Sequence, residues 1–209
     1  MTAAAVAAPR HARRRRRWAL GIAAIAALGL LSLGCTSTIT PPREPAHPTT
    51  VYLLREAMHS GLVLPPSPGS PDYVEYGFGD WGWFALGHDA WYHVFATVLW
   101  PTAGALARRT FAAANDSELR ARVTWAELQA LTVDGDLVAR LRAELQQRFE
   151  AGLAHAVRRA DLGWTFVPMD RGYWFGNTCA DVAAEWFVAL GCEVSWVPIR
   201  ASLTTGTGS

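Results

Sequence analysis

Three segments in the first half of the chain have the length and residue pattern of β-strands. They are Val51–Leu54 (VYLL), His59–Pro65 (HSGLVLP) and Tyr73–Gly79 (YVEYGFG). The connection between the second and the third is rich in proline, which has no N–H group to extend a strand ladder. The pattern therefore predicts a hairpin between these two strands, with the centre of its loop near Pro68.

Two later segments have helical periodicity. Asp136–Leu153 is amphipathic, and a second periodic segment ends at Gly191, the usual residue at a helix stop. Asn177 and Thr178 are both good N-cap residues, so this second helix is predicted to begin beside Cys179. Its apolar stripe includes the cysteine together with Ala180, Val182, Ala183, Trp186, Phe187 and Leu190.

Three weaker patterns complete the predicted elements. Asp89–Thr102 is apolar on nearly every side, which is typical of a buried helix or of one that contacts lipid. Thr124 and Glu127 have the spacing of a capping box at a helix start, and Glu193–Ile199 adds a last strand. The predicted elements follow the order of strands, then a helical middle, then a capped helix. This order predicts an α+β fold with an antiparallel sheet.

The N-terminal segment has the organisation of an export signal. Six arginines, Arg10 and Arg13–Arg17, precede an apolar run, Trp18–Leu33, that is short for a membrane span. The run ends in LSLGC, which resembles the lipobox of bacterial lipoproteins, in which lipid is attached to the cysteine and the chain is cut before it. Ser32 stands where leucine is usual. The alternative is an uncleaved signal anchor in which Cys35 is an incidental apolar residue.

The domain boundaries follow from composition. Residues 1–34 are interpreted as a signal peptide of lipoprotein type, and residues 35–49, rich in Pro and Thr, as a tether. Residues 50–200 are predicted to form one folded domain, and residues 201–209 to be a disordered polar tail. We therefore expect a protein of the bacterial cell envelope that faces the periplasm and is lipid-anchored to a membrane. Thr36 after the cysteine is compatible with the outer membrane.

The distribution of charge excludes one class of partner. The chain of 209 residues has a formal net charge of +1, but this value includes the six arginines of the signal segment. Without them the chain carries 13 basic against 18 acidic residues, a net charge of −5. A protein that binds nucleic acid needs a basic face to neutralise phosphates. We expect no nucleic-acid partner.

Cys179 is open to three interpretations: a packing residue, half of a disulfide, or a nucleophile. A disulfide with Cys192 conflicts with the predicted helix, because a helix of this length separates the two Cα atoms by about 20 Å. A disulfide requires less than about 7 Å. Burial as a small hydrophobic residue is favoured for Cys192 and stays open for Cys179, which lies on the apolar stripe.

The nucleophile interpretation has a physical basis. The unpaired N–H groups at a helix start favour a thiolate, and they can also hold an oxyanion when the sulfur attacks a carbonyl. A thiolate nucleophile also needs a histidine from elsewhere in the chain. His59 is the candidate, because it opens a strand and small residues follow it. The claims of the other histidines are weaker: His88, His93 and His155 in the domain, and His47 in the tether.

Four blocks of the sequence resemble a known family. TVYLLREAMHSGLVLP, YVEYGFGDWGWF, WPTAGAL and NTCADVAAEWFVALGCEV occur in this order and are similar to the urease-region conserved hypothetical proteins of Proteobacteria, a domain of unknown function. More distantly, the order resembles circularly permuted NlpC-type papain-like proteins, which include cell-wall amidases, peptidases and acyltransferases. That resemblance implies a papain-like core in which Cys179 is the nucleophile, His59 the base and Glu75 the residue that orients the base.

The predicted hairpin also favours Glu75. A loop centre near Pro68 brings Glu75 close to His59 across the ladder, within reach of an imidazole N–H. Asp80, in GFGD, is the alternative orienting residue, although an acid flanked by glycine more often makes a turn.

We therefore expect a thiol hydrolase or acyltransferase that acts on an amide or ester in the cell envelope, with cell-wall peptide or lipid as substrate. Neither a metal nor another cofactor is expected, because the Cys and His residues lack the close spacing of a ligand set. The alternative is a non-catalytic envelope lipoprotein that binds a peptide or lipid and has an inert Cys179. The two hypotheses differ in whether the thiol is reachable and has a low pKa.

Overall fold

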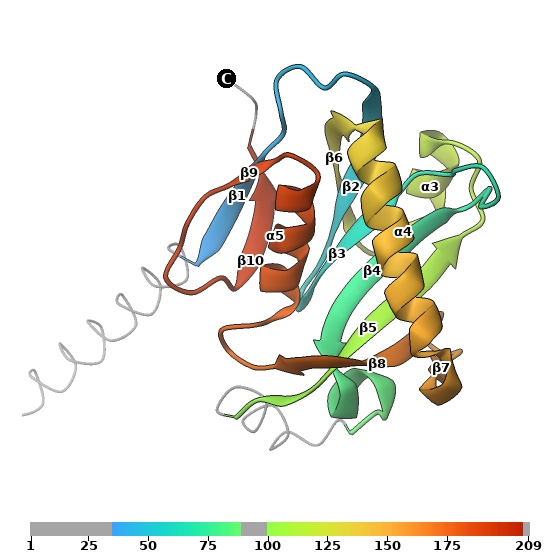
Figure 1. The fold of residues 1–209 in the computed structure, drawn as a ribbon, viewed down its shortest axis with the longest axis vertical. Helices are drawn as coiled ribbons and strands as arrows, with labels where there is room; N and C mark the ends of the chain where they lie inside the picture. The colour runs from blue at the N-terminus through green and yellow to red at the C-terminus, as the bar shows by residue number, and fades with distance from the viewer. Residues whose placement is uncertain (1–34, 89–99, 207–209) are drawn as a thin grey trace, which may run out of the picture.

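The protein contains a large antiparallel sheet, a small second sheet and helices that pack against them (Figure 1). The computed structural model describes residues 35–88 and 100–206. The large sheet has 7 strands in the order β6-β2-β3-β4-β5-β8-β7, and every neighbouring pair is antiparallel. The small sheet has the order β10-β1-β9. The predicted α+β class with an antiparallel sheet is confirmed.

The bounds of the elements are as follows. The large sheet consists of β2 (Pro48–Glu56), β3 (His59–Leu64), β4 (Tyr73–Asp80), β5 (Thr102–Phe111), β6 (Glu127–Asp134), β7 (Val157–Arg159) and β8 (Trp164–Tyr173). The small sheet consists of β1 (Thr36–Thr40), β9 (Glu193–Val194) and β10 (Ser202–Thr205). The helices are α3 (Asp116–Arg122), α4 (Gly135–Ala151) and α5 (Cys179–Ala189), with short helical turns η1 (Trp81–Ala85) and η2 (Leu153–His155).

Helices α4 and α5 cover one face of the large sheet. Alternate residues of β4, Val74 and Tyr76, point to this face and join a core that includes Leu145 of α4 and Phe187 of α5. Each fully buried side chain of this size contributes roughly 1.5–3 kcal/mol of transfer free energy. Glu75 lies between Val74 and Tyr76 in the strand, so its side chain points to the opposite face. The alternation therefore directs one carboxylate away from the main core.

The predicted helix start at Thr124 is wrong. Glu127 begins β6 instead, and this strand pairs with β2 from Pro48 through Arg55. The capping-box spacing is a local signal, and pairing over the whole length of a neighbouring strand overrides it. The preceding helix α3 was not predicted, although Asn115 caps it by accepting a hydrogen bond from the backbone N–H of Glu118.

The predicted tether and tail both contain strands. Thr36–Thr40 forms β1, and Ser202–Thr205 forms β10 beside it in parallel. Ile39 and Leu203 are fully buried in the main core. Each segment alone carries too few apolar residues to indicate a strand, and each is ordered by pairing with the other end of the chain. The tether prediction is therefore wrong for Thr36–Thr40 and the prediction of disorder is wrong for Ser202–Thr205.

The remaining predictions of elements have mixed outcomes. The two periodic helices are confirmed as α4 and α5, whereas the last strand is confirmed only at Glu193–Val194. The signal segment and residues 89–99 of the apolar Asp89–Thr102 segment lie outside the described residues; its last residue, Thr102, opens β5. Within residues 35–88 and 100–206, no helix has the length and apolar character needed to cross a membrane.

Candidate active site

His59 and Glu75 meet on the face of the sheet that points away from the main core. His59 Nε2 lies 3.4 Å from Glu75 Oε1, and the Glu75 side chain is fully buried. The ladder pairs Glu75 with Val63, so the imidazole reaches the carboxylate diagonally over Gly77. A Cβ atom at Gly77 would lie 2.7 Å from His59 Cε1. The glycine therefore leaves the space in which the ring lies.

Arg109 of β5 binds the second oxygen of the same carboxylate. Its Nε donates to Glu75 Oε2 at 2.5 Å, and its Nη2 contacts Glu56 Oε1 at 3.1 Å. The guanidinium also lies 4.2 Å from the ring centroids of both Trp164 and Trp125. A buried carboxylate needs such a partner, because an unpaired buried charge is costly. Sequence reasoning missed Arg109, which carries no motif.

Cys179 opens α5 and lies against the turn that precedes His59. Thr178 is the N-cap, one of the two candidates that the sequence offered, and it forms a capping box with Asp181. Cys179 Sγ lies 3.8 Å from the carbonyl oxygen of Met58. The structure therefore brings together the three residues predicted from the sequence: Cys179, His59 and Glu75.

Cys179 and His59 each shift the pKa of the other so that the charged form is favoured. Burial lowers the pKa of His59, but its interactions with Cys179 and Glu75 outweigh burial and raise that pKa to about 10. Burial raises the pKa of Cys179, whereas His59 and the backbone N–H groups of Ser60 and Ala180 act in the opposite direction and lower it overall. Opposite shifts of this kind favour a thiolate–imidazolium pair at neutral pH.

The phenol of Tyr173 lies beside the nucleophile. It interacts with the backbone of Cys179, and Tyr173 is the last residue of β8 before the connection to α5. Burial and the negative charges of Cys179 and Asp80 raise the pKa of Tyr173, so its hydroxyl stays protonated. A protonated phenol at this place can donate a hydrogen bond beside the start of α5.

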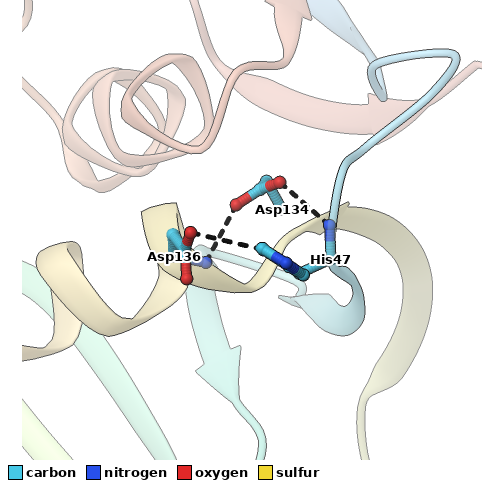
Figure 2. Close-up of side chains that lie close together, drawn as sticks. All are labelled: His47, Asp134 and Asp136. Atoms are coloured by element: carbon cyan, nitrogen blue, oxygen red, sulfur yellow. Dashed lines mark hydrogen bonds and ion pairs between the residues drawn. The ribbon is translucent and has the colours of Figure 1, made fainter.

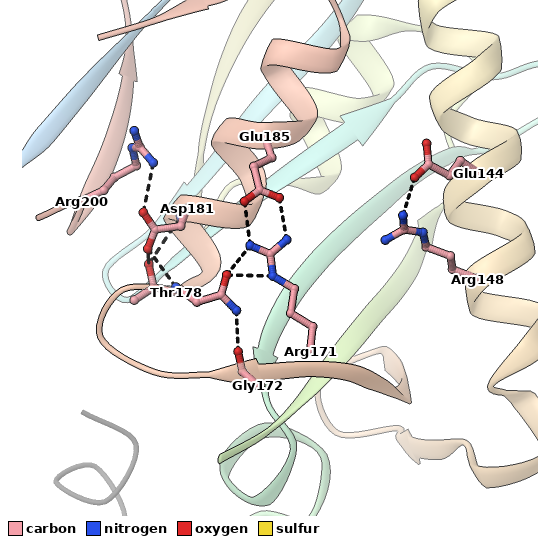
Figure 3. Close-up of polar contacts among 9 residues, drawn as sticks. Glu144, Arg148, Arg171, Gly172, Thr178, Asp181, Glu185 and Arg200 are labelled. Atoms are coloured by element: carbon pink, nitrogen blue, oxygen red, sulfur yellow. Dashed lines mark hydrogen bonds and ion pairs between the residues drawn. The ribbon is translucent and has the colours of Figure 1, made fainter. Parts of the chain in front are cut away.

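Arg171 fixes the loop that leads to Cys179 (Figure 3). Its Nε donates to Asn177 Oδ1 at 2.8 Å, and its guanidinium forms two further hydrogen bonds with Glu185 of α5 at 2.5 and 2.6 Å. The Asn177 side-chain nitrogen donates to the carbonyl oxygen of Gly172. The buried Asn177 is therefore a structural part of the NTC motif, since it holds the turn before the helix.

A second arginine connects the small sheet to the same helix start (Figure 3). Arg200 Nη1 donates to Asp181 Oδ1 at 3.0 Å, and Arg200 Nε donates to Ser37 Oγ of β1 at 2.8 Å. Asp181 thus caps the backbone of Thr178 and pairs with a cation from the other sheet. The first turn of α5 and the residues before it are therefore bound by two arginines, Arg171 and Arg200.

Asp80, the alternative orienting residue, is engaged elsewhere. Its Oδ1 accepts a hydrogen bond from the backbone N–H of Trp83 at 2.6 Å, and its Oδ2 accepts one from the Thr102 hydroxyl. Asp80 therefore caps η1, and Glu75 is the carboxylate that faces His59.

The other histidines are not placed in this triad. His155 is exposed in η2, His88 follows η1, and His93 lies outside the described residues. His47 contacts Asp136 at 3.3 Å from its Nδ1, and its backbone N–H donates to Asp134 (Figure 2). Within the described ranges, these three are the group of side chains close enough to bind one metal ion. Asp134 is the N-cap of α4, so helix capping accounts for the cluster.

Cys192 has the environment expected of a packing residue. Its side chain is buried, and burial raises its pKa to about 11. None of the three cysteines, Cys35, Cys179 and Cys192, forms a disulfide. This agrees with the helix geometry, which separates Cys179 from Cys192.

A pocket of about 180 Å³ is lined by His59 but not by Cys179. Its charged residues are Glu56 and Arg109, and its other lining residues are Phe78, Gly79, Phe84, Ala107, Leu162, Trp164 and Phe166. His59 packs edge-on against Trp164, with ring centroids 5.7 Å apart. The sequence did not predict this pocket, because it is built by strands and turns that are distant along the chain.

Comparisons with protein-family models, with curated proteins and with solved structures found no match to this chain. The assignment of a function therefore depends on the chemistry of the Cys179, His59 and Glu75 side chains.

Proposed function

We propose that the protein is an exported thiol hydrolase or acyltransferase that acts on an amide or ester in the cell envelope. The observation that supports this most directly is the position of His59 between buried Glu75 and Cys179 at the start of a capped helix. The order of a histidine strand, a carboxylate strand and a cysteine helix agrees with a circularly permuted NlpC-type papain-like core. The resemblance to the urease-region conserved hypothetical family is part of the same proposal.

The proposed reaction has two steps. The Cys179 thiolate attacks the carbonyl carbon and forms a C–S bond, while the oxyanion is held by N–H groups at the start of α5. Protonated His59 then gives its proton to the leaving amine or alcohol as the bond to it breaks. In the second step His59 takes a proton from water or from an acceptor hydroxyl, whose oxygen attacks the thioester and releases Cys179. Glu75 keeps the imidazole oriented through Nε2.

The substrate class follows from location and surroundings. The basic and apolar N-terminal segment with Cys35 at its end supports export and lipid attachment at that residue, so cell-wall peptides and envelope lipids are within reach. The aromatic pocket beside His59 suits an apolar group of the substrate.

The second candidate is a non-catalytic lipoprotein that binds a peptide or lipid. The burial of Cys179, of which 9% is exposed, favours this alternative, because a buried thiol can be an inert core residue. The two candidates differ in the reactivity of the thiol.

Alkylation of the folded, full-length protein by iodoacetamide at pH 6 to 7 tests the proposal. We expect modification at Cys179 to be roughly tenfold or more faster than at an unperturbed thiol, because a larger fraction is thiolate. His59→Ala should slow this reaction, whereas Cys192→Ser should leave it unchanged. Reaction of Cys179 only after unfolding, or with an ordinary thiol pH profile that ignores His59→Ala, would favour the binding protein.

A further inference from the structure

Five large apolar side chains are exposed on segments that lie near the start of α5 or the start of β1. Trp196, Trp100 and Met58 are 81%, 74% and 71% exposed, and Trp174 and Phe175 are close to half exposed. We call these five residues the apolar rim. Scattered single apolar residues are normal on a protein surface, but a group of them with several tryptophans is characteristic of an interaction surface.

Four rim residues lie on segments that contact Cys179, lead to it along the chain, or pair with the strand before it. The carbonyl oxygen of Met58 is the atom that Cys179 Sγ contacts. Thr102 pairs with Tyr173, and its hydroxyl donates to the Tyr173 carbonyl oxygen at 3.0 Å. Trp100 precedes Thr102 by two residues, and Trp174 and Phe175 follow Tyr173 towards α5, so these three residues adjoin the end of the β5–β8 ladder.

The fifth residue connects the rim to the point where the chain enters the domain. Ser195 and Thr38 bind each other through two hydrogen bonds of 2.8 and 2.9 Å. Because β9 runs antiparallel to β1, the next residue, Trp196, lies towards the beginning of β1. The carbonyl oxygen of Cys35 accepts a hydrogen bond from Ala201 at 2.8 Å. In Figure 1 the start of β1 lies at the left of the molecule, and the β8–α5 connection lies below it.

No flexible tether separates Cys35 from the folded domain, since β1 begins at Thr36. One extended residue spans about 3.3–3.6 Å. A lipid on Cys35 would therefore hold this edge of the domain against the headgroup region of the membrane. Tryptophan is enriched in that region because its ring is amphipathic.

We propose that the apolar rim docks on a phospholipid bilayer, so that the start of α5, which Arg200 connects to β1, faces the membrane. This inference rests on the proposed lipid anchor at Cys35, and it concerns the orientation of the domain, which the anchor alone leaves undefined. The bilayer is the partner because the proposed lipid on Cys35 would insert into it directly beside the start of β1.

The test uses the full chain in vesicles of phosphatidylethanolamine and phosphatidylglycerol that contain a phospholipid with a photoactivatable acyl chain. After illumination, labelled peptides are mapped by mass spectrometry. We expect several-fold more label on peptides with Met58, Trp100, Trp174 and Trp196 than on the peptide with Leu153. Leu153, in η2, is a matched control because it too is about half exposed. Equal labelling of the Leu153 peptide, or an unlabelled rim, would overturn the proposal.

A double variant tests membrane docking separately from the proposed enzyme activity and the proposed lipid anchor. Trp100→Ser with Trp174→Ser should stay anchored and folded but lose most of the labelling at Met58 and Trp196, whereas Leu153→Ser should keep it. Unchanged labelling in the double variant would show that the exposed rings do not hold the surface to the bilayer. Thiol reactivity of Cys179 and release of the chain from membranes are measured separately, so failure of docking is distinct from failure of the enzyme or of the anchor.

Discussion

At the scale of single residues, the candidate site depends on one buried carboxylate with two different partners. Glu75 accepts from Arg109 at one oxygen and faces His59 with the other. His59 has a pKa raised to about 10 and Cys179 has a lowered pKa, so the ion pair exists between these two values and is lost as the pH falls through the lower or rises through the upper. The lowered pKa of Cys179 extends this pH range downwards, and the raised pKa of His59 extends it upwards.

Glu75→Gln tests the orienting role. The substitution keeps the size of the side chain but removes the charge that supports protonated His59, so the thiolate becomes less populated at neutral pH. We expect the alkylation rate of Cys179 at pH 6.5 to fall roughly tenfold and the pH profile to move upwards.

Glu56→Gln is the matched control for this experiment. Glu56 also contacts Arg109, but His59 is paired with Glu75. The control should therefore keep the wild-type pH profile. Equal profiles for the two variants would mean that Glu75 only stabilises the sheet.

The sequence was sufficient to predict that Cys179, His59 and Glu75 lie close together. It was insufficient to predict the residues that bind and position them. Cys179 was recognisable from a helix start, His59 from a strand start and Glu75 from an estimated register that needed only to be approximately right. Arg109 lies directly opposite Glu75 on β5, but the sequence pattern did not predict β5 as a strand, so nothing local identified Arg109. The alternative residue, Asp80, could be excluded only when its contacts with Trp83 were known.

At the scale of elements, local signals succeeded where an element is stabilised by its own residues. Helices α4 and α5 carry their periodicity and caps within the sequence, and both were predicted. Strands β1, β6 and β10 depend on partners far along the chain, and the parallel pair β1 and β10 joins residues 36–39 to 202–205. Non-local pairing leaves little trace in a short segment.

The start of α5 offers the sharpest test at this scale. Asp181→Ala removes the capping box between Thr178 and Asp181, and it also removes the ion pair between Asp181 and Arg200. We expect a loss of about 1–2 kcal/mol in the free energy of unfolding, measured by urea denaturation. Alkylation of Cys179 should slow as well, because its helix turn is less well held.

Glu144→Ala is the control for the helix cap. Its carboxylate pairs with Arg148 on the exposed side of α4 (Figure 3), a pair worth only about 0.3–0.5 kcal/mol. A loss of stability as large as that of Asp181→Ala would contradict a special role for the α5 cap. So would an Asp181→Ala variant with wild-type stability and thiol reactivity.

At the scale of the whole molecule, the two ends of the chain close the domain together. β1 and β10 are side by side, and Arg200 joins them to the first turn of α5. The residue before β1 is Cys35, so the proposed lipid anchor, the small sheet and the candidate nucleophile are mechanically connected. The sequence interpretation of residues 35–49 as a tether had separated the anchor from the site. The structure removes that separation.

The proposed anchor has a direct test in cells that export the protein. If lipid is attached to Cys35, labelled palmitate should be incorporated into the wild-type chain and into the Cys192→Ser control. Incorporation should be lost in Cys35→Ser, because the thiol is the attachment atom. The wild-type chain should also lack the first 34 residues, since lipoprotein processing cuts before the cysteine. An unlabelled wild-type chain of full length would instead identify Trp18–Leu33 as an uncleaved anchor. Label that survives Cys35→Ser would place the lipid on another residue.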